Sequence, residues 1–179
     1  MKKTISEVFD DFKNANTRDE KIHILRSNYT FSLKYILQGT FHPNIEFVFE
    51  SIPPYKKSGI PDGMGYTTID QELGRAYIFE RNNPKVSPGL SQKRKTELLI
   101  QVLEALEDRE ASVFEHMLLK KQLIPGLTYD LVKEAFPELL PDFNPGTKVD
   151  ILPTKEELPE DDKNFIRIIG NSPISKIFN

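Results

Sequence analysis

Two lysines, a Pro-Gly pair and a threonine lie close together in the second half of the chain, and their types suit phosphate binding. Lys120 and Lys121 follow apolar residues at helical spacing, which places them at a helix C-terminus, where the helix dipole favours cations. Pro125-Gly126 predicts a tight turn, and Thr128 is suited to cap a second short helix. Such a helical hairpin can grip a phosphate, and it can equally be an ordinary structural hairpin.

Two further basic clusters could face the phosphates of a nucleic acid. Lys93, Arg94 and Lys95 fall in the first turn of the longest expected helix, where they oppose the helix dipole at a cost of up to about 1 kcal/mol. A solvated helix start is one explanation, and contact with phosphates is the other. Lys56 and Lys57 lie in a Pro/Gly-rich loop and could contribute to the same face.

The sequence lacks the patterns of the common catalytic and metal sites. It contains no cysteine, and its three histidines have neither the mutual spacing nor the carboxylate partners typical of a metal site. A glycine-rich phosphate loop, a dinucleotide fingerprint and a serine nucleophile elbow are also absent from it. We therefore expect a non-enzymatic protein with no metal site and no cofactor.

Length and charge limit the class of protein further. The 179 residues suffice for one domain of ordinary size with a tail. The net charge of −3 argues against a strongly electrostatic nucleic-acid binder. The excess of acidic over basic residues lies in residues 126–179, which hold 6 Lys/Arg and 10 Asp/Glu. The start, MKKTISEVFDDF, lacks the apolar run of a signal peptide, and no transmembrane span follows. We expect a soluble cytoplasmic protein with no membrane partner.

Helical periodicity dominates the first 143 residues. Thr4-x-x-Glu7 and Thr17-x-x-Glu20 are capping boxes that predict the first two helices. Further helices are expected at about 29–39 (ending at Gly39), 68–81 and 92–107 (capped by Ser91) and in the two halves of the hairpin, with a Pro/Gly-rich loop at 51–66. With about seven helices and no convincing sheet, the predicted fold is all-α, a compact multi-helix body.

The character of the chain changes near its C-terminal end. We expect a helical domain over 1–143, an acidic, proline-rich linker over 144–163 and an apolar segment over 164–179. An apolar segment after a polar linker is typical of a docking element. It can also pack back onto the helical body.

Three stretches together resemble a known family. They are LRSNYTFSLKYIL, PPYKKSGIPDGMGYTTID and EASVFEHMLLKKQLIPGLTYDLVKEAFPELLP, which resemble the N-terminal helical DNA-binding domain of ATP-dependent DNA ligases, most of all those of T-even bacteriophages. The resemblance covers about residues 17–143. The chain also resembles a family of small uncharacterised tailed-phage proteins that share this module.

The resemblance implies contact with the backbone of duplex DNA and no ligase activity. The adenylation motif KxDG is missing, and too few residues remain for the nucleotidyltransferase and OB domains of a ligase. The hairpin turn falls where those ligases place a Gly-x-Ser/Thr helix start. The resemblance therefore implies backbone contacts at Lys120, Lys121, Gly126 and Thr128. The basic clusters complete the expected DNA-backbone contacts with Lys56, Lys57, Lys93, Arg94 and Lys95.

The C-terminal residues are similar to a second pattern, the sliding-clamp-binding peptide Q-x-x-[ILM]-x-x-[FY]-[FY]. Asn171 stands in the Gln position, Ile174 and Phe178 match, and Ile177 replaces the first aromatic residue. The three apolar side chains would meet on one helical turn and enter an apolar pocket of the clamp. Such a peptide at the end of an acidic tether suits recruitment of a partner.

These patterns favour a non-catalytic phage accessory protein of DNA replication or repair, located in the host cytoplasm. Its helical body would contact duplex DNA without sequence specificity, and its C-terminus would recruit a protein such as a sliding clamp. The alternative is a protein-interaction module with a ligase-like fold that does not bind DNA and acts on a host or phage protein.

Overall fold

The computed structural model describes residues 3–61 and 64–142. Residues Met1–Pro141 form one compact unit. The expected linker at 144–163 and the apolar segment at 164–179, with the expected docking residues Asn171, Ile174, Ile177 and Phe178, lie outside the described residues.

The described part of the chain is helical and contains no β-strand. Its elements are α1 (Ile5–Asn14), α2 (Arg18–Ser27), α3 (Phe31–Phe41), α4 (Ile69–Glu72), the 3-10 helix η1 (Leu73–Phe79), α5 (Gln92–Ala105), α6 (Asp108–Leu118) and α7 (Tyr129–Ala135). The seven α-helices confirm the expected all-α fold. None of the described helices has the length and apolar character needed to cross a membrane.

Helix starts follow the capping signals in the sequence. Thr4 and Thr17 both form full capping boxes, and Ser91 and Thr128 accept a backbone hydrogen bond as N-caps of α5 and α7. In the second box the Thr17 hydroxyl accepts the Glu20 N–H at 3.2 Å, while the Glu20 carboxylate accepts the Thr17 N–H at 3.1 Å. The N–H groups of Thr17 and Asn16, which both donate to the Glu20 carboxylate, lower the pKa of Glu20. Two amide groups that the helix itself cannot satisfy are thus paired.

Replacement of Thr17 by alanine is expected to destabilise the fold by about 1 kcal/mol, because one helix amide loses its acceptor. Replacement by serine keeps the hydroxyl and should cost much less. Urea denaturation followed by circular dichroism would compare the two variants. Equal losses for alanine and serine would contradict the role of the cap.

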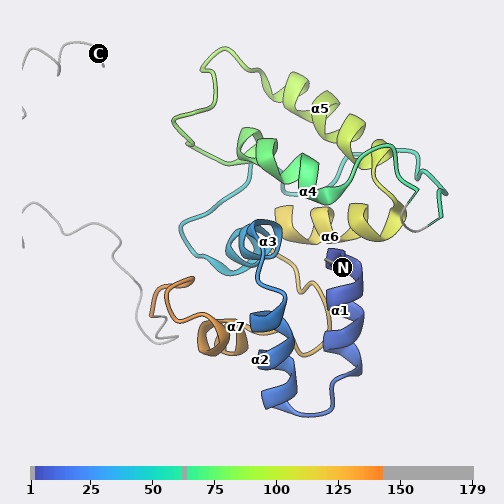
Figure 1. Ribbon diagram of the computed structural model, residues 1–179. Helices are drawn as coiled ribbons and strands as arrows, with labels where there is room; N and C mark the ends of the chain where they lie inside the picture. The colour runs from blue at the N-terminus through green and yellow to red at the C-terminus, as the bar shows by residue number, and fades with distance from the viewer. Residues whose placement is uncertain (1–2, 62–63, 143–179) are drawn as a thin grey trace, which may run out of the picture. The chain divides into compact units, whose positions relative to one another are not determined.

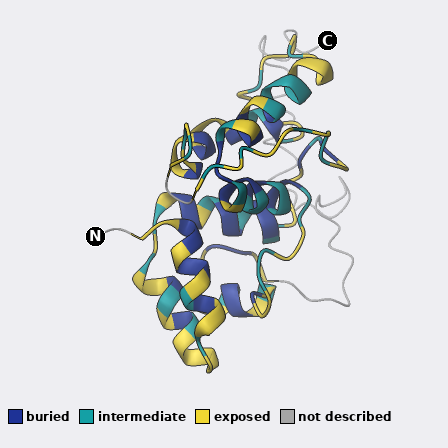
Figure 2. Ribbon diagram, turned by 90° about the vertical axis from the view of Figure 1, so that its right-hand side faces the viewer, coloured by how far each residue is buried: buried dark blue, intermediate teal, exposed yellow. Residues whose placement is uncertain are grey.

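The helices pack around one apolar core (Figure 1). Helices α1 and α2 lie side by side, α7 packs on α2, and α6 crosses the centre of the unit against α3. The largest fully buried side chains come from α1, α2, α3, α5 and α6, from the segment α4–η1, and from Leu106 directly after α5. Figure 2 shows the buried faces of these helices turned inward and the exposed faces outward. The core thus fixes the helices and the loops between them, which carry the candidate site residues.

Gly39 does not end the third helix, as the sequence had suggested. Helix α3 continues to Phe41, and Gly39 is buried within it. A Cβ atom there would lie 2.9 Å from Met117 Cγ on α6 and 3.2 Å from Phe47 Cζ. The glycine is needed for the close approach of α3 to α6.

The segment expected to form one helix at about 68–81 also differs from that expectation. It is a single α-helical turn, α4, followed by η1, and it ends at Phe79. Glu80 is extended and forms an isolated antiparallel bridge with Phe47, and Arg81 donates its N–H to Glu46 O at 2.7 Å. Pairing with the 45–49 segment therefore competes with continuation of the helix.

Candidate nucleic-acid interface

The two lysines after α6 have different environments. The helix ends in a Schellman motif, in which Lys120 N–H donates to Met117 O at 3.1 Å and Lys121 N–H donates to His116 O at 2.8 Å. Lys120 takes the left-handed conformation that this motif requires, with φ of +52°. Because the chain turns there, Lys120 and Lys121 point to different surroundings, and Lys121 is exposed.

Lys120 is directed to the protein rather than to solvent. Its ammonium group donates to the carbonyl of His42, the residue that ends α3. Burial lowers the pKa of Lys120, and the charge of Glu46 acts in the opposite direction. Burial and the charge of Lys120 lower the pKa of His42. Lys120 therefore ties α6 to α3, which leaves it poorly placed to bind a phosphate.

The Pro-Gly turn of the hairpin is a type II β-turn. Leu127 N–H donates to Ile124 O at 3.2 Å, Pro125 takes the second position, and Gly126 has φ of +83° in the third position, where a positive value is required. Leu127 is fully buried and anchors the turn, while Gly126 and Thr128 are exposed. The Thr128 hydroxyl accepts the Leu131 N–H at 3.4 Å and can still donate its own hydrogen.

A lysine that the sequence analysis did not select lies against this turn. A Cβ atom on Gly126 would lie 3.0 Å from Lys21 Nζ, and the same ammonium group lies 5.2 Å from the centre of the Phe12 ring. Lys13, at the end of α1, lines a hollow of about 340 Å³ together with Ile124 and Pro125. No signal in the sequence links these helices to the hairpin, because the contact spans more than a hundred residues. We call Lys13, Lys21, Gly126 and Thr128 the turn surface.

The charges around the turn surface are mixed. Asp10 lines the same hollow as Lys13 and forms an ion pair with Arg109 at 2.6 Å. Asp130 is exposed in the first turn of α7. The turn surface is thus a small cationic site within a nearly neutral surrounding, which suits contact with one or two phosphates.

The cluster Lys93, Arg94 and Lys95 lies in the first turn of α5, as the sequence predicted. Lys93 is exposed, whereas Arg94 forms an ion pair with Glu97 at 2.9 Å. The pair reduces the charge that this cluster can offer to a phosphate.

The loop with Lys56 and Lys57 is anchored where α5 meets α6. Lys56 N–H donates to Glu104 Oε1 at 3.1 Å, and Ser58 Oγ donates to Asp108 Oδ1 at 3.3 Å. The Tyr55 hydroxyl donates to Glu115, and burial together with this bond raises the pKa of Tyr55. Both lysine side chains are exposed on the anchored loop.

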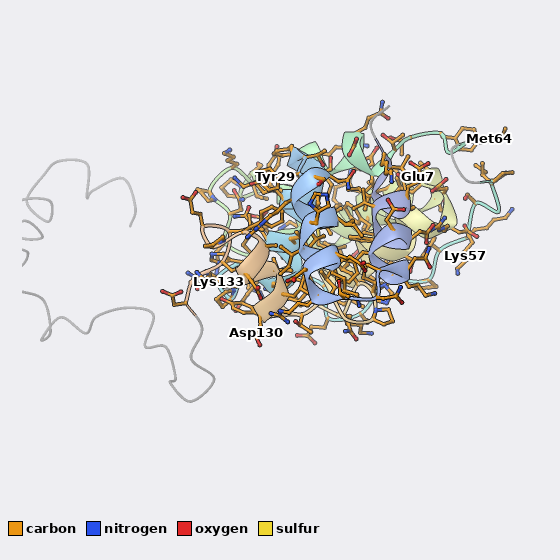
Figure 3. All side chains as sticks on the ribbon, turned by 60° about the horizontal axis from the view of Figure 1, so that its bottom comes forward. Glu7, Tyr29, Lys57, Met64, Asp130 and Lys133 are labelled. Carbon is orange, nitrogen blue, oxygen red and sulfur yellow. The ribbon has the colours of Figure 1, made fainter. Side chains whose placement is uncertain are left out.

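The structure does not gather the expected cations at one place. Lys93 and Glu104 are eleven residues apart on α5, or about 16 Å along the helix axis. Lys56 and Lys57 therefore lie near one end of α5 and the basic cluster near the other. In Figure 3, Lys57 lies at the opposite end of the unit from Asp130 of α7. Among the expected contacts, the structure brings together Gly126 and Thr128, and it adds Lys13 and Lys21.

Residues 8–123 match a protein family described as a family of unknown function (DUF6433). The chain belongs to this family. The family match includes α2 with Lys21 and ends before the turn residues Gly126 and Thr128. A comparison with curated proteins finds no match.

Proposed function

We propose that this protein contacts the backbone of duplex DNA through the turn surface, as a non-catalytic accessory protein of DNA replication or repair. The observation that carries the proposal is the position of Lys21 Nζ against Gly126, two residues before the exposed N-cap residue Thr128. Cations and hydrogen-bond donors of this kind bind phosphate oxygens and do not distinguish bases. Binding would therefore be independent of sequence and weakened by salt.

The ligase resemblance supports the same role and extends it. A phage-encoded protein of this type would act in the host cytoplasm. Its C-terminal residues Asn171, Ile174, Ile177 and Phe178 would recruit a partner such as a sliding clamp. The body would then hold DNA while the C-terminal peptide engages the replication machinery.

Fluorescence anisotropy of a labelled duplex, titrated at low and near-physiological salt, would test DNA binding. Lys21→Gln is expected to weaken binding by about tenfold at low salt and to reduce the slope of log K against log salt by about one, because one phosphate contact is lost. The comparison variant is Lys93→Gln, which likewise removes one lysine, an exposed one on α5, but leaves the turn surface intact.

Each result has a distinct meaning. A larger loss with Lys93→Gln than with Lys21→Gln would move the interface to α5. Equal affinity of the wild type and Lys21→Gln would exclude the turn surface as the contact. Absence of binding by the wild type at low salt would exclude the DNA-binding role.

The separation of the cations favours a second candidate function, a protein-interaction module that does not bind DNA. Tyr66 and Met64 support it, because their side chains are 86% and 71% exposed on the anchored loop. Exposed apolar side chains that lie close together can form a patch that binds another protein. In this case the partner would be a host or phage protein.

A further inference from the structure

A groove between α3 and α7 combines aromatic rings with positive charge. It has a volume of about 410 Å³ and is lined by residues that include Tyr29, Lys34, Gln38, Phe136 and Leu139. This volume lies within the range of small-ligand sites. The groove is separate from the turn surface, since Thr128 and Phe136 flank opposite ends of α7.

The aromatic rings of the groove are accessible and held in place. The Tyr29 ring lies 4.7 Å from the Phe136 ring, centre to centre, and Tyr29 is 48% exposed. Contact with Phe136 fixes the Tyr29 ring while part of it stays open to solvent. A fixed and accessible ring of this kind can stack on any nucleobase, because every base has a π face.

The charges around the groove suit an anionic ligand. Lys34 is an exposed lining residue. Arg26 donates to Ala135 O at 2.9 Å, and Lys133 donates to Pro137 O at 2.7 Å, so both cations are bound to backbone at the groove. Its carbonyl partner leaves the positive charge of Arg26 in place. Among the described residues that line the groove, Glu138 is the one carboxylate.

The groove and the turn surface are within reach of one DNA strand. Thr128 precedes α7 and Phe136 follows it, so the two sites are separated by about 12 Å along this helix. A strand whose phosphates contact the turn surface can therefore continue to the groove within a few nucleotides. In an intact duplex its bases are paired and stacked, so only an unpaired base can lie against Tyr29.

We propose that the groove binds an unpaired nucleotide next to the duplex, with its base on Tyr29 and its phosphate at Lys34. The proposal rests on the proposed DNA-binding function and makes it more specific. The preferred ligand would be duplex DNA with a single-stranded overhang, rather than a continuous duplex.

Anisotropy titrations with the full chain would compare a blunt duplex with the same duplex carrying a single-stranded thymidine overhang. The wild type is expected to bind the overhang duplex about tenfold more tightly, as stacking of one base predicts. Tyr29→Ala should remove this advantage and leave the affinity for the blunt duplex unchanged. Tyr29→Phe keeps the ring and should preserve the advantage, as should Tyr66→Ala, which removes an exposed tyrosine elsewhere.

A second variant, Lys34→Gln, keeps the result independent of any effect of Tyr29→Ala on packing against Phe136. It should reduce the overhang advantage without changing blunt-duplex binding. Equal affinity of the wild type for the two DNAs would overturn the nucleotide site while leaving the proposed function standing. Persistence of the advantage in both Tyr29→Ala and Lys34→Gln would also overturn it. Absence of binding to either DNA would overturn both proposals and leave the groove as a surface for a protein.

Discussion

Replacement of Phe114 by alanine is expected to lower the free energy of unfolding by about 3–5 kcal/mol. Phe114 is fully buried near the middle of α6. Its ring meets the Phe79 ring edge-on, with centres 6.2 Å apart and planes at 89°, and Phe79 in turn lies 5.7 Å from Phe49. Alanine would leave a cavity where three segments of the chain meet and would remove a favourable aromatic contact.

Phe31→Ala is the matched control, since it makes the same chemical change at a ring that is 64% exposed. Its effect on stability should remain within about 0.5 kcal/mol. Urea denaturation of both variants, followed by circular dichroism, would measure the difference. A loss below about 1 kcal/mol for Phe114→Ala would show that the core relaxes around the cavity and that α6 is not its centre.

The position of Phe114 matters for function because α6 supports both the turn surface and the loop that carries Lys56 and Lys57. Its C-terminal end leads into the turn surface, and its side chains Asp108 and Glu115 anchor the loop that carries Lys56 and Lys57. A variant that loosens α6 should therefore disturb every candidate interface at once. Loss of binding in Phe114→Ala would carry no information about which surface binds, and surface variants are needed for that purpose.

The sequence predicted those features that depend on neighbouring residues. Thr4, Thr17 and Thr128 each cap a helix because the hydroxyl and its amide partner are three residues apart. Contacts between distant segments were not accessible in this way. Gly39 was interpreted as a helix end, since its close contact with Met117 is visible only when α3 and α6 are packed together.

The candidate site was predictable to the same extent, that is, only in its local features. The hairpin and its turn could be recognised from local spacing, but the partners of its charges could not. Lys120 binds the carbonyl of His42, and Lys21 approaches Gly126 from a helix more than a hundred residues earlier in the chain. Packing between helices sets the direction of a long, flexible side chain. Basic residues that are neighbours in the sequence therefore do not by themselves predict a cationic surface.

A buried carboxyl group, Glu110, should make the stability of the fold depend on pH near neutrality. Glu110 lies on α6 and accepts the N–H of Ile69, the first residue of α4, at 2.9 Å. Burial is the main cause that raises the pKa of Glu110 to about 7, the Ile69 hydrogen bond acts against it, and the nearby carboxylates of Glu107 and Asp70 contribute to the rise. The carboxyl group is therefore protonated in the folded protein at pH values where it is ionised in the unfolded chain.

The sign of the effect follows from proton binding. Between about pH 4.5 and pH 7 the folded state holds a proton on Glu110 that the unfolded state has lost, so stability falls as pH rises through this range. The stabilisation is fully present below pH 4.5 and is lost as pH rises through about 7, by about 2–3 kcal/mol in total. His42 acts in the opposite direction, because its lowered pKa favours unfolding as pH falls below 6.5.

Glu110→Gln separates these two contributions, since glutamine can accept the Ile69 hydrogen bond without carrying a charge. The variant should match the wild type at pH 5 and exceed it by about 2–3 kcal/mol at pH 8, and the remaining pH dependence should come from His42 and other groups. Urea denaturation at intervals between pH 5 and pH 8 would measure both proteins. If the two curves run parallel over this range, Glu110 titrates far from neutrality. In that case the α4–α6 contact is held by an ionised carboxylate.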